Sequence, residues 1–480
     1  MTGRECTAGC RENPVNKGNE GGNSMKIVVL NGSPKGDISV TMQYIAYIRK
    51  KYPIHSWKIL NVAQDIRKIE MDTVAWNTLV GSIRSADIVL WAFPLYYLVV
   101  CSQYKRFIEL VFERNAQDAF AGTYAASLST SIHFFDQIAH AYIHAVSDDL
   151  GMKYLGFYSA EMRDLLKEEE RKRLEKFAAL LFTAVQEKIP VQRENAPLVW
   201  PTLSYVPGTQ QKTYKTGTKK VVILTDSDGS SPNLAAMTDR LLKNFSGPVE
   251  MINLHDVNIK GGCLGCCQCG YDNTCVYTDG YVDFFKNKLV PADIIIMSGS
   301  VHDRYLSSAW KQFFDRSFFK GHTPGLEGKQ IGFVIAGPLH QIPHLKESLS
   351  AWADNGGCHA QFVTDEASGS GELDAILDTL AARLIQNAEA GYIPPHTFYA
   401  IGGHKIFRDS IYGGMRIAFQ ADYRYYTEHG MFDFPQADLK TRLFNAILIP
   451  LTRIPGFRKK VFADMKHHMI EPFEPVLRNA

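Results

Sequence analysis

The sequence has no long apolar run and no strong excess of one charge. No stretch approaches the roughly 18 consecutive apolar residues of a membrane-spanning helix, and the formal net charge of the 480 residues is +2. The composition therefore gives no indication of a nucleic-acid partner. Residues 1–24 lack the apolar segment of a secretory signal. We expect a disordered tail over residues 1–24 and a cytoplasmic, reducing compartment.

Cysteine is scarce, and its distribution is uneven. Only nine residues are cysteine, and five of them lie in the run CLGCCQCGYDNTC from residue 263 to 275. Four follow the spacing C-x2-C-x2-C-x5-C, with Cys267 as a fifth thiol inside the run: Cys263, Cys266, Cys269 and Cys275. Because a reducing compartment disfavours disulfides, thiolate ligation gains weight here. The other thiols are interpreted as incidental in the tail or as buried packing residues: Cys6 and Cys10, and Cys101 and Cys358.

Two stretches of the first half of the chain recur in the second half. The segment KIVVLNGSPKGDISVTM resembles KVVILTDSDGSSPNLAAM 194 residues further on, and SADIVLWAFPLYYLVVCSQYKRFIE resembles PADIIIMSGSVHDRYLSSAWKQFFD 206 residues further on. The second copy has therefore gained about 12 residues between these landmarks. Since the cysteine run lies in that interval, we interpret it as an insertion into a duplicated unit.

Each copy alternates strand-like and helix-like segments. The first copy has five strand-like runs, at residues 26–30, 57–60, 87–93, 124–128 and 153–157. The second has five more, at residues 221–224, 249–254, 293–299, 331–336 and 360–363. Five βα units in succession predict an α/β fold with a parallel, doubly wound sheet. We predict domains at 25–190 and 219–392, a linker at 191–218 and a helical extension at 393–480.

The predicted extension is rich in aromatic and basic residues. A helix is expected at 439–448, before breaks at Pro450 and Pro455, and the basic stretch GFRKKVFADMKHHM follows. A packing arm with a solvated face is the favoured interpretation. Peripheral contact with an anionic membrane is the alternative.

The first strand-to-helix turn has the composition of a phosphate site. Its small residues let backbone N–H groups face an anion at a helix N-terminus. Three hydroxyls and one cation add to this, from Ser33, Ser39, Thr41 and Lys35. The turn is neither a P-loop nor a G-x-G-x-x-G motif, which disfavours ATP and a Rossmann dinucleotide. A plain βα turn is the alternative.

Two further loops could complete a site for a flat ring. Pro94, Leu95, Tyr96 and Tyr97 follow the third strand of the first copy, and residues 129–131 follow the fourth. A proline and paired aromatics at a strand's carboxyl end suit a heteroaromatic ring, and Ser129, Thr130 and Ser131 could form a polar rim. The alternative is that the tyrosines are ordinary core aromatics.

The first turn, together with PLYY-x4-S-x2-K-x-F-I-E, resembles the flavodoxin-like, NAD(P)H-dependent FMN reductase family and its iron–sulfur flavoprotein branch. The resemblance covers residues 25–190 well and 219–390 in part, and it departs at Val40, where the family has Asn. It implies two flavodoxin-like sheets of strand order 2-1-3-4-5, with FMN phosphate at residues 33–41 and the isoalloxazine beside residues 94–97. The second copy has Asp226 and Asp228 at the equivalent turn, and these carboxylates would repel a phosphate.

The cysteine run also resembles the motif of the iron–sulfur branch. That resemblance assigns Cys263, Cys266, Cys269 and Cys275 as ligands of a 4Fe–4S cluster, and Cys267 as a spectator. Four thiolates suit such a cluster. Zinc and unmetallated thiols stay open as alternatives.

We therefore expect an NAD(P)H-dependent FMN oxidoreductase. It would move electrons between NAD(P)H or ferredoxin, FMN and the cluster, with small molecules or proteins as donors and acceptors. Hydride transfer to flavin requires no protein acid or base, so no catalytic residue is predicted. The alternatives are a cluster-free quinone or flavin reductase and a non-enzymatic electron carrier or redox-responsive binding protein. A homo-oligomer is compatible with the sequence.

Overall fold

The computed structural model describes residues 24–323, 325–434 and 438–478. The predicted tail, with Cys6 and Cys10, lies outside these ranges except for residue 24. The chain forms two compact units, one ending at Asp422 and the other beginning at Tyr423.

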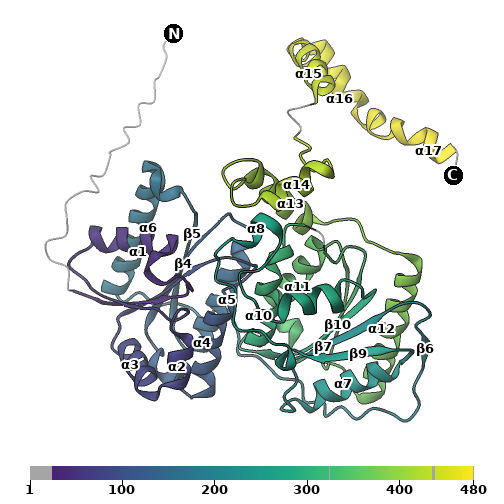
Figure 1. Cartoon of the computed structure of the whole chain (residues 1–480). Helices are drawn as coiled ribbons and strands as arrows, with labels where there is room; N and C mark the ends of the chain where they lie inside the picture. Colours follow the sequence, from purple (N-terminus) through teal and green to yellow (C-terminus); the bar gives the residue numbers. More distant parts are fainter. Residues whose placement is uncertain (1–23, 324, 435–437, 479–480) are drawn as a thin grey trace, which may run out of the picture. The chain divides into compact units, whose positions relative to one another are not determined.

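The first domain contains a five-stranded parallel sheet in the order β2-β1-β3-β4-β5, as predicted. Its strands are β1 (Lys26–Asn31), β2 (Ser56–Leu60), β3 (Ile88–Pro94), β4 (Tyr124–Ser131) and β5 (Lys153–Glu161). Its helices are α1 (Val40–Lys51), α2 (Ile66–Met71), α3 (Thr73–Arg84), α4 (Ser102–Glu113), α5 (Asp136–Asp149) and α6 (Glu168–Gln186). Helices cover both faces of the sheet (Figure 1).

The second domain repeats this topology, with strands in the order β13-β12-β10-β7-β9. Its strands are β7 (Val221–Thr225), β9 (Val249–Asn253), β10 (Ile294–His302), β12 (Gln330–Ala336) and β13 (His359–Thr364). Its main helices are α7 (Pro232–Lys243), α10 (Ser308–Arg316), α11 (Pro343–Asn355) and α12 (Ser370–Ala390). A short strand, β11 (Tyr305–Leu306), pairs antiparallel with β10. Two flavodoxin-like sheets are thus confirmed.

Equivalent helices build the apolar core on one face of each sheet. In the first domain Met42 and Ile45 of α1 and Leu174 of α6 pack on Ile27 and Val29 of β1. In the second domain α7 and α12 supply the corresponding side chains: Leu234, Met237, Leu373 and Leu377. The central strands are buried along almost their whole length, which is typical of a parallel sheet covered on both faces.

The cysteine run lies between β9 and β10, where the repeat predicts the insertion. It contains the short helix α8 (Cys269–Asp272), and a second short helix, α9 (Tyr281–Phe284), follows it. The corresponding interval of the first domain, between β2 and β3, holds α2 and α3.

The two domains contact each other through the second repeated landmark. Helices α4 and α10 pack together. The N–H of Ser102 donates to Asp315 (2.7 Å), and the N–H of Ser308 donates to Glu109 (2.5 Å). Each motif K-x-F-x-acid therefore caps the N-terminus of the other domain's helix, which gives the contact a pseudo-twofold character.

The predicted linker packs on the second domain. Residues 187–213 have no helix or strand, yet Tyr205 is buried in the core beside Ile223, and its hydroxyl donates to Asp374 (2.6 Å). Helix α13 (Phe398–Tyr412) then packs on α11, so residues 393–422 belong to the same compact unit as the sheets.

The second compact unit is helical. It holds most of α14 (Gln420–Glu428), then α15 (Leu439–Leu451), α16 (Pro455–Ile470) and α17 (Glu474–Arg478). The helix predicted to end at residue 448, before Pro450, continues to Leu451 and includes Pro450, so its predicted end is three residues too early. A proline in the last turn displaces few backbone hydrogen bonds, and Pro455 begins α16, where its missing N–H costs nothing. Among the described residues, no helix is both long and apolar enough to cross a bilayer.

Candidate functional site: a cavity beside a loop of thiols

The turn after β1 is tightly ordered by its own polar groups. Ser33 is fully buried, and its hydroxyl accepts from the backbone N–H of Lys35 (3.2 Å). Ser39 caps α1 by accepting from the N–H of Met42 (3.3 Å). The turn therefore presents its polar groups at the N-terminus of α1, where the helix dipole favours an anion.

The turn and the loops after β3 and β4 meet at the carboxyl edge of the first sheet. The hydroxyl of Thr41 is hydrogen-bonded to that of Thr130 (2.7 Å). The ammonium of Lys35 lies 5.7 Å from the centre of the Tyr96 ring. Burial raises the pKa of Tyr96 well above its ordinary value, although a hydrogen bond with Ser33 acts in the opposite direction, so the phenol stays neutral.

These loops line a cavity of about 150 Å³. Seven of the eleven residues predicted to bind a cofactor face it: Lys35, Ser39, Pro94, Leu95, Tyr96, Thr130 and Ser131. Its remaining wall comes from elsewhere in the chain, including Gly265 and Cys267 of the cysteine loop and Phe407 of α13. Polar groups of the first domain's turn therefore line one part of the cavity, and mainly apolar groups line the rest.

The other four predicted residues lie beside the cavity without lining it. Ser33 and Thr41 are buried beneath the turn. Ser129 bonds the Nε2 atom of His140 (2.8 Å) in the core. Tyr97 points to the second domain, where its carbonyl accepts from Lys311 (3.1 Å).

The cysteine loop approaches the first domain at Gly265. This residue has φ +62°, and a Cβ there would lie 2.2 Å from the Cζ atom of Tyr96. Only glycine can adopt this backbone conformation at no steric cost and also admit the ring. Cys267, two residues further on, is also at positive φ (58°), and it lines both this cavity and the one that the thiols share.

His322 is a residue of this cavity that the sequence did not reveal. It is buried, its Nδ1 lies 3.5 Å from the carboxylate of Asp422, and its Nε2 has no hydrogen-bond partner among the described residues. The aromatic rings of Phe318, Phe407 and Phe419 surround it. A lone histidine in FFKGHTPG matches no motif, so only the fold could place it here.

All five thiols of the run face one small cavity of about 20 Å³, walled by apolar groups such as Leu264 and Phe319. They are free thiols. Burial disfavours the thiolate, so it raises the pKa of Cys263 and raises that of Cys269 to about 12. Within the described ranges, no three His, Cys, Asp or Glu side chains are arranged as a metal-ion site.

Arg316 holds the two ends of the cysteine loop together. Its buried guanidinium donates to the carbonyl of Gly261 (3.0 Å) and forms two bonds of 2.8 Å with Asp279. Burial alone would raise the pKa of Asp279, but the bonds from Arg316 outweigh it and lower that pKa. A bidentate pair of this kind fixes geometry strongly.

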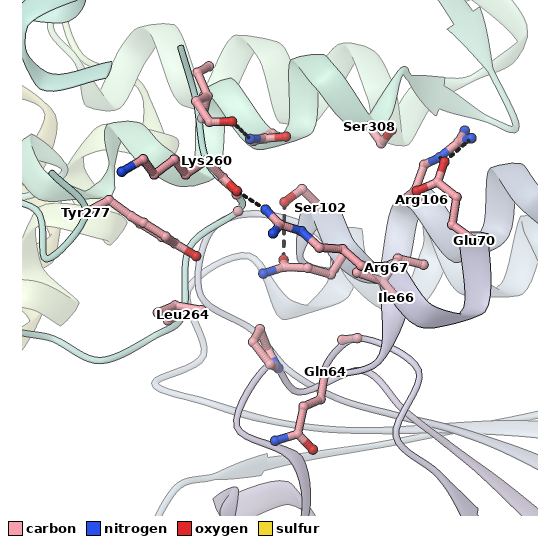
Figure 2. Close-up of a pocket in the computed structure, with 17 residues that line it drawn as sticks. Gln64, Ile66, Arg67, Glu70, Ser102, Arg106, Lys260, Leu264, Tyr277 and Ser308 are labelled. Atoms are coloured by element: carbon pink, nitrogen blue, oxygen red, sulfur yellow. Dashed lines mark hydrogen bonds and ion pairs between the residues drawn. The ribbon is translucent and has the colours of Figure 1, made fainter. Parts of the chain in front are cut away.

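A second, larger cavity of about 750 Å³ lies between the domains (Figure 2). Its lining is polar and includes Arg67, whose guanidinium donates to the carbonyl of Lys260. Arg106 is paired with Glu70 (2.7 Å). Leu264 and Tyr277 line both this cavity and that of the thiols, and they therefore separate the two.

Comparison with known proteins agrees with the strand order. Residues 25–181 match the family model described as flavodoxin-like fold, and residues 220–374 match that of NADPH-dependent FMN reductase. The chain is a tandem of two flavodoxin-like domains. The match of the second domain to the model of NADPH-dependent FMN reductase agrees with the predicted enzyme class.

An iron–sulfur flavoprotein of Archaeoglobus fulgidus is 29% identical to this tandem chain over 141 residues. The match covers 28% of this chain and 63% of that protein's length. Two solved structures are similar to about one third of this chain. The NAD(P)H:acceptor oxidoreductase FerB of Paracoccus denitrificans has 17% identity and a TM-score of 0.29, covering 34% of this chain and 98% of its own. General stress protein 14 of Treponema denticola, solved with FMN, has 12% identity and a TM-score of 0.27, covering 34% and 99%.

The second domain has its own cavity, of about 290 Å³, at the turn after β7. Carboxylates line it, including Asp226, Asp228 and Glu109. Burial raises the pKa of Asp226, although a hydrogen bond from Ser307 opposes this. The cavity therefore differs in charge from the turn of the first domain, where Gly32 and Pro34 occupy the corresponding positions.

Proposed function

We propose that the chain is an FMN-dependent oxidoreductase that moves electrons between NAD(P)H or ferredoxin, FMN and an iron–sulfur cluster. The observation that carries this proposal is the position of Cys267, which lines both the cavity of the first domain's loops and the cavity of the five thiols. FMN in the first cavity and a cluster in the second would therefore both lie next to Cys267.

The residue types around the first domain's cavity suit FMN. The polar turn at Lys35 and Ser39 suits a phosphate, and the apolar wall suits a flat ring. The unpartnered Nε2 of His322 is a buried polar atom that a flavin oxygen or nitrogen could satisfy. When bound, FMN supplies the conversion of a two-electron hydride into single electrons.

The donor set of the cysteine loop fits an iron–sulfur cluster in kind and number. Four thiolates are required, and Cys263, Cys266, Cys269 and Cys275 face one cavity. Ligation would require their deprotonation, which the positive charge of a metal favours. A bound cluster would supply one-electron transfer. Zinc or free thiols stay as alternatives for this loop, and with free thiols the chain would be a cluster-free reductase.

The larger cavity between the domains is the candidate site for a small-molecule electron donor or acceptor. Its volume of about 750 Å³ lies in the range of small-molecule sites. A cytoplasmic, reducing compartment would keep the thiols available for a cluster.

The test begins with protein purified and reconstituted without oxygen. We expect flavin bands and a broad iron–sulfur absorbance, iron and acid-labile sulfide in matching amounts, and bleaching of the flavin on rapid mixing with NADH or NADPH. Flavin without iron would contradict the cluster and support the alternative of a cluster-free reductase. Bound flavin that neither nucleotide bleaches would contradict the reductase and support the alternative of a non-enzymatic electron carrier.

A matched pair of variants locates the flavin. The double variant Ser33→Ala, Tyr96→Ala should release FMN, because it alters the turn and the ring contact of the first cavity. Ser227→Ala, His302→Ala changes the equivalent turn and loop of the second domain and should retain it. Equal loss of FMN in both, measured by flavin fluorescence, would contradict the assignment.

A further inference from the structure

Helix α15 exposes a broad apolar face. Leu439, Leu443, Ile447 and Leu451 are spaced four residues apart and therefore share one side of the helix, and Phe444 borders it. Leu439 and Leu443 are 73% and 64% exposed, and no residue of the helix is buried. Asp438 caps the helix by accepting from the N–H groups of Lys440 and Thr441, so the helix begins at a defined residue.

Helix α16 also exposes large apolar side chains, and Arg458 lies on the same side of the helix as they do. Phe462, Met465 and Met469 follow at intervals of three and four residues, which places them on one side. Phe462 and Met469 are 68% and 66% exposed. The first turns of the helix carry three exposed cations, Arg458, Lys459 and Lys460.

The charge of this segment is opposite to that of the rest of the chain. Residues 439–470 contain seven Lys and Arg residues and one Asp, a net charge of +6, whereas the whole chain carries +2. All other residues together therefore carry −4. The cations are concentrated on the same two helices that expose large apolar side chains.

We propose that α15 and α16 bind the surface of an anionic membrane. Such a surface offers both features that the helices require, negative charge for the cations and an acyl boundary for the apolar side chains. Neither helix is long and apolar enough to span, so they lie in the interface. The proposal does not depend on the bound redox groups.

The experiment is sedimentation of the full chain with vesicles of phosphatidylcholine, with and without phosphatidylglycerol. We expect binding to the anionic vesicles only, weakened by added salt. Leu443→Ser, Ile447→Ser should reduce the partition coefficient at least tenfold. Lys459→Gln, Lys460→Gln should reduce it by roughly fivefold for each cation removed.

Matched controls use exposed positions of the first domain. Leu180→Ser, on α6, removes one exposed apolar side chain, and Lys50→Gln, Lys68→Gln removes the same number of cations as the test variant; both control variants should leave vesicle binding unchanged. Circular dichroism verifies that each variant is folded. Equal binding to neutral vesicles, or no binding to either kind, would overturn the proposal. So would a stoichiometric complex with a soluble protein that forms while the anionic vesicles are ignored.

Discussion

His322 shows how much a single side chain of this chain depends on distant segments. It belongs to the second domain, lines the cavity of the first domain's loops, and is oriented by Asp422 near the end of the first compact unit. A buried ring nitrogen without a partner is unfavourable unless a ligand satisfies it. The histidine is therefore expected to contribute to binding of FMN.

The first prediction concerns this nitrogen. His322→Ala should weaken FMN binding roughly two- to tenfold, the value of one hydrogen bond, whereas His322→Gln retains an amide and should lose less. Fluorescence titration of FMN measures both. His302→Ala, in the second domain's cavity, is the control and should bind FMN as the unmodified chain does. An alanine variant with unchanged affinity would show that the nitrogen does not face the flavin.

Two other histidines predict how stability depends on pH. His140 is bonded by Ser127 and Ser129 in the first core, and His344 donates to the carbonyl of Arg304 in the second domain. Burial lowers the pKa of each to about 4. Their folded pKa lies below the unfolded value of about 6.5. Protons therefore bind the unfolded chain preferentially between these values, and stability falls as pH falls through that window.

The second prediction follows from this sign. The free energy of unfolding should decrease by up to about 1.4 kcal/mol per pH unit for each histidine between pH 6.5 and 4. Urea unfolding at several pH values measures the slope. The variant His140→Gln, His344→Gln should be less stable at neutral pH and show a flatter slope. An unchanged slope would mean that other groups dominate acid unfolding.

At the scale of elements, the strands were predictable because buried apolar runs recur at matching positions in both copies, and their order followed from the resemblance to the flavodoxin-like family. The insertion was predictable because the two landmarks are separated by different distances. The walls of the cavity were not, since Phe407 lies more than 300 residues from the first turn and no local pattern links them. Likewise, nothing in the sequence near Tyr97 shows that its ring points to the other domain.

The cysteine loop gives the prediction that belongs to this scale. Arg316→Met would leave Asp279 buried without its partner, which costs about 3–5 kcal/mol, and would free both ends of the loop. We expect faster reaction of the five thiols with a disulfide reagent and a lower free energy of unfolding. Arg67→Met, which removes an exposed contact to the same loop at Lys260, should have a much smaller effect. Combining Arg316→Met with Asp279→Leu should restore part of the stability.

At the scale of the whole molecule, the duplicated motif K-x-F-x-acid joins the two domains. Lys105 lies 3.2 Å from Glu109, Lys311 pairs with Asp315, and each carboxylate also accepts from the first turn of the opposite helix. The two halves are not electrostatically equal. Burial opposes ionisation of Glu109, but Lys105, Ser308 and Arg106 outweigh it and lower its pKa. Burial dominates at Asp315 and raises its pKa.

This asymmetry predicts unequal effects of two matched substitutions. Glu109→Gln should destabilise the chain by about 3–5 kcal/mol, because it removes a carboxylate that the folded state prefers charged. Asp315→Asn removes a charge that burial disfavours and should cost no more than about 1–3 kcal/mol. The loss of stability in Glu109→Gln should shrink as pH falls below about 4.3, where the unfolded Glu109 is itself protonated.

Urea unfolding measures these values, and Glu113→Gln, at the exposed end of the same network, is the control. Equal costs at Glu109 and Asp315 would mean that the domain contact is held by its packing and backbone bonds, with no preference for which carboxylate carries the charge.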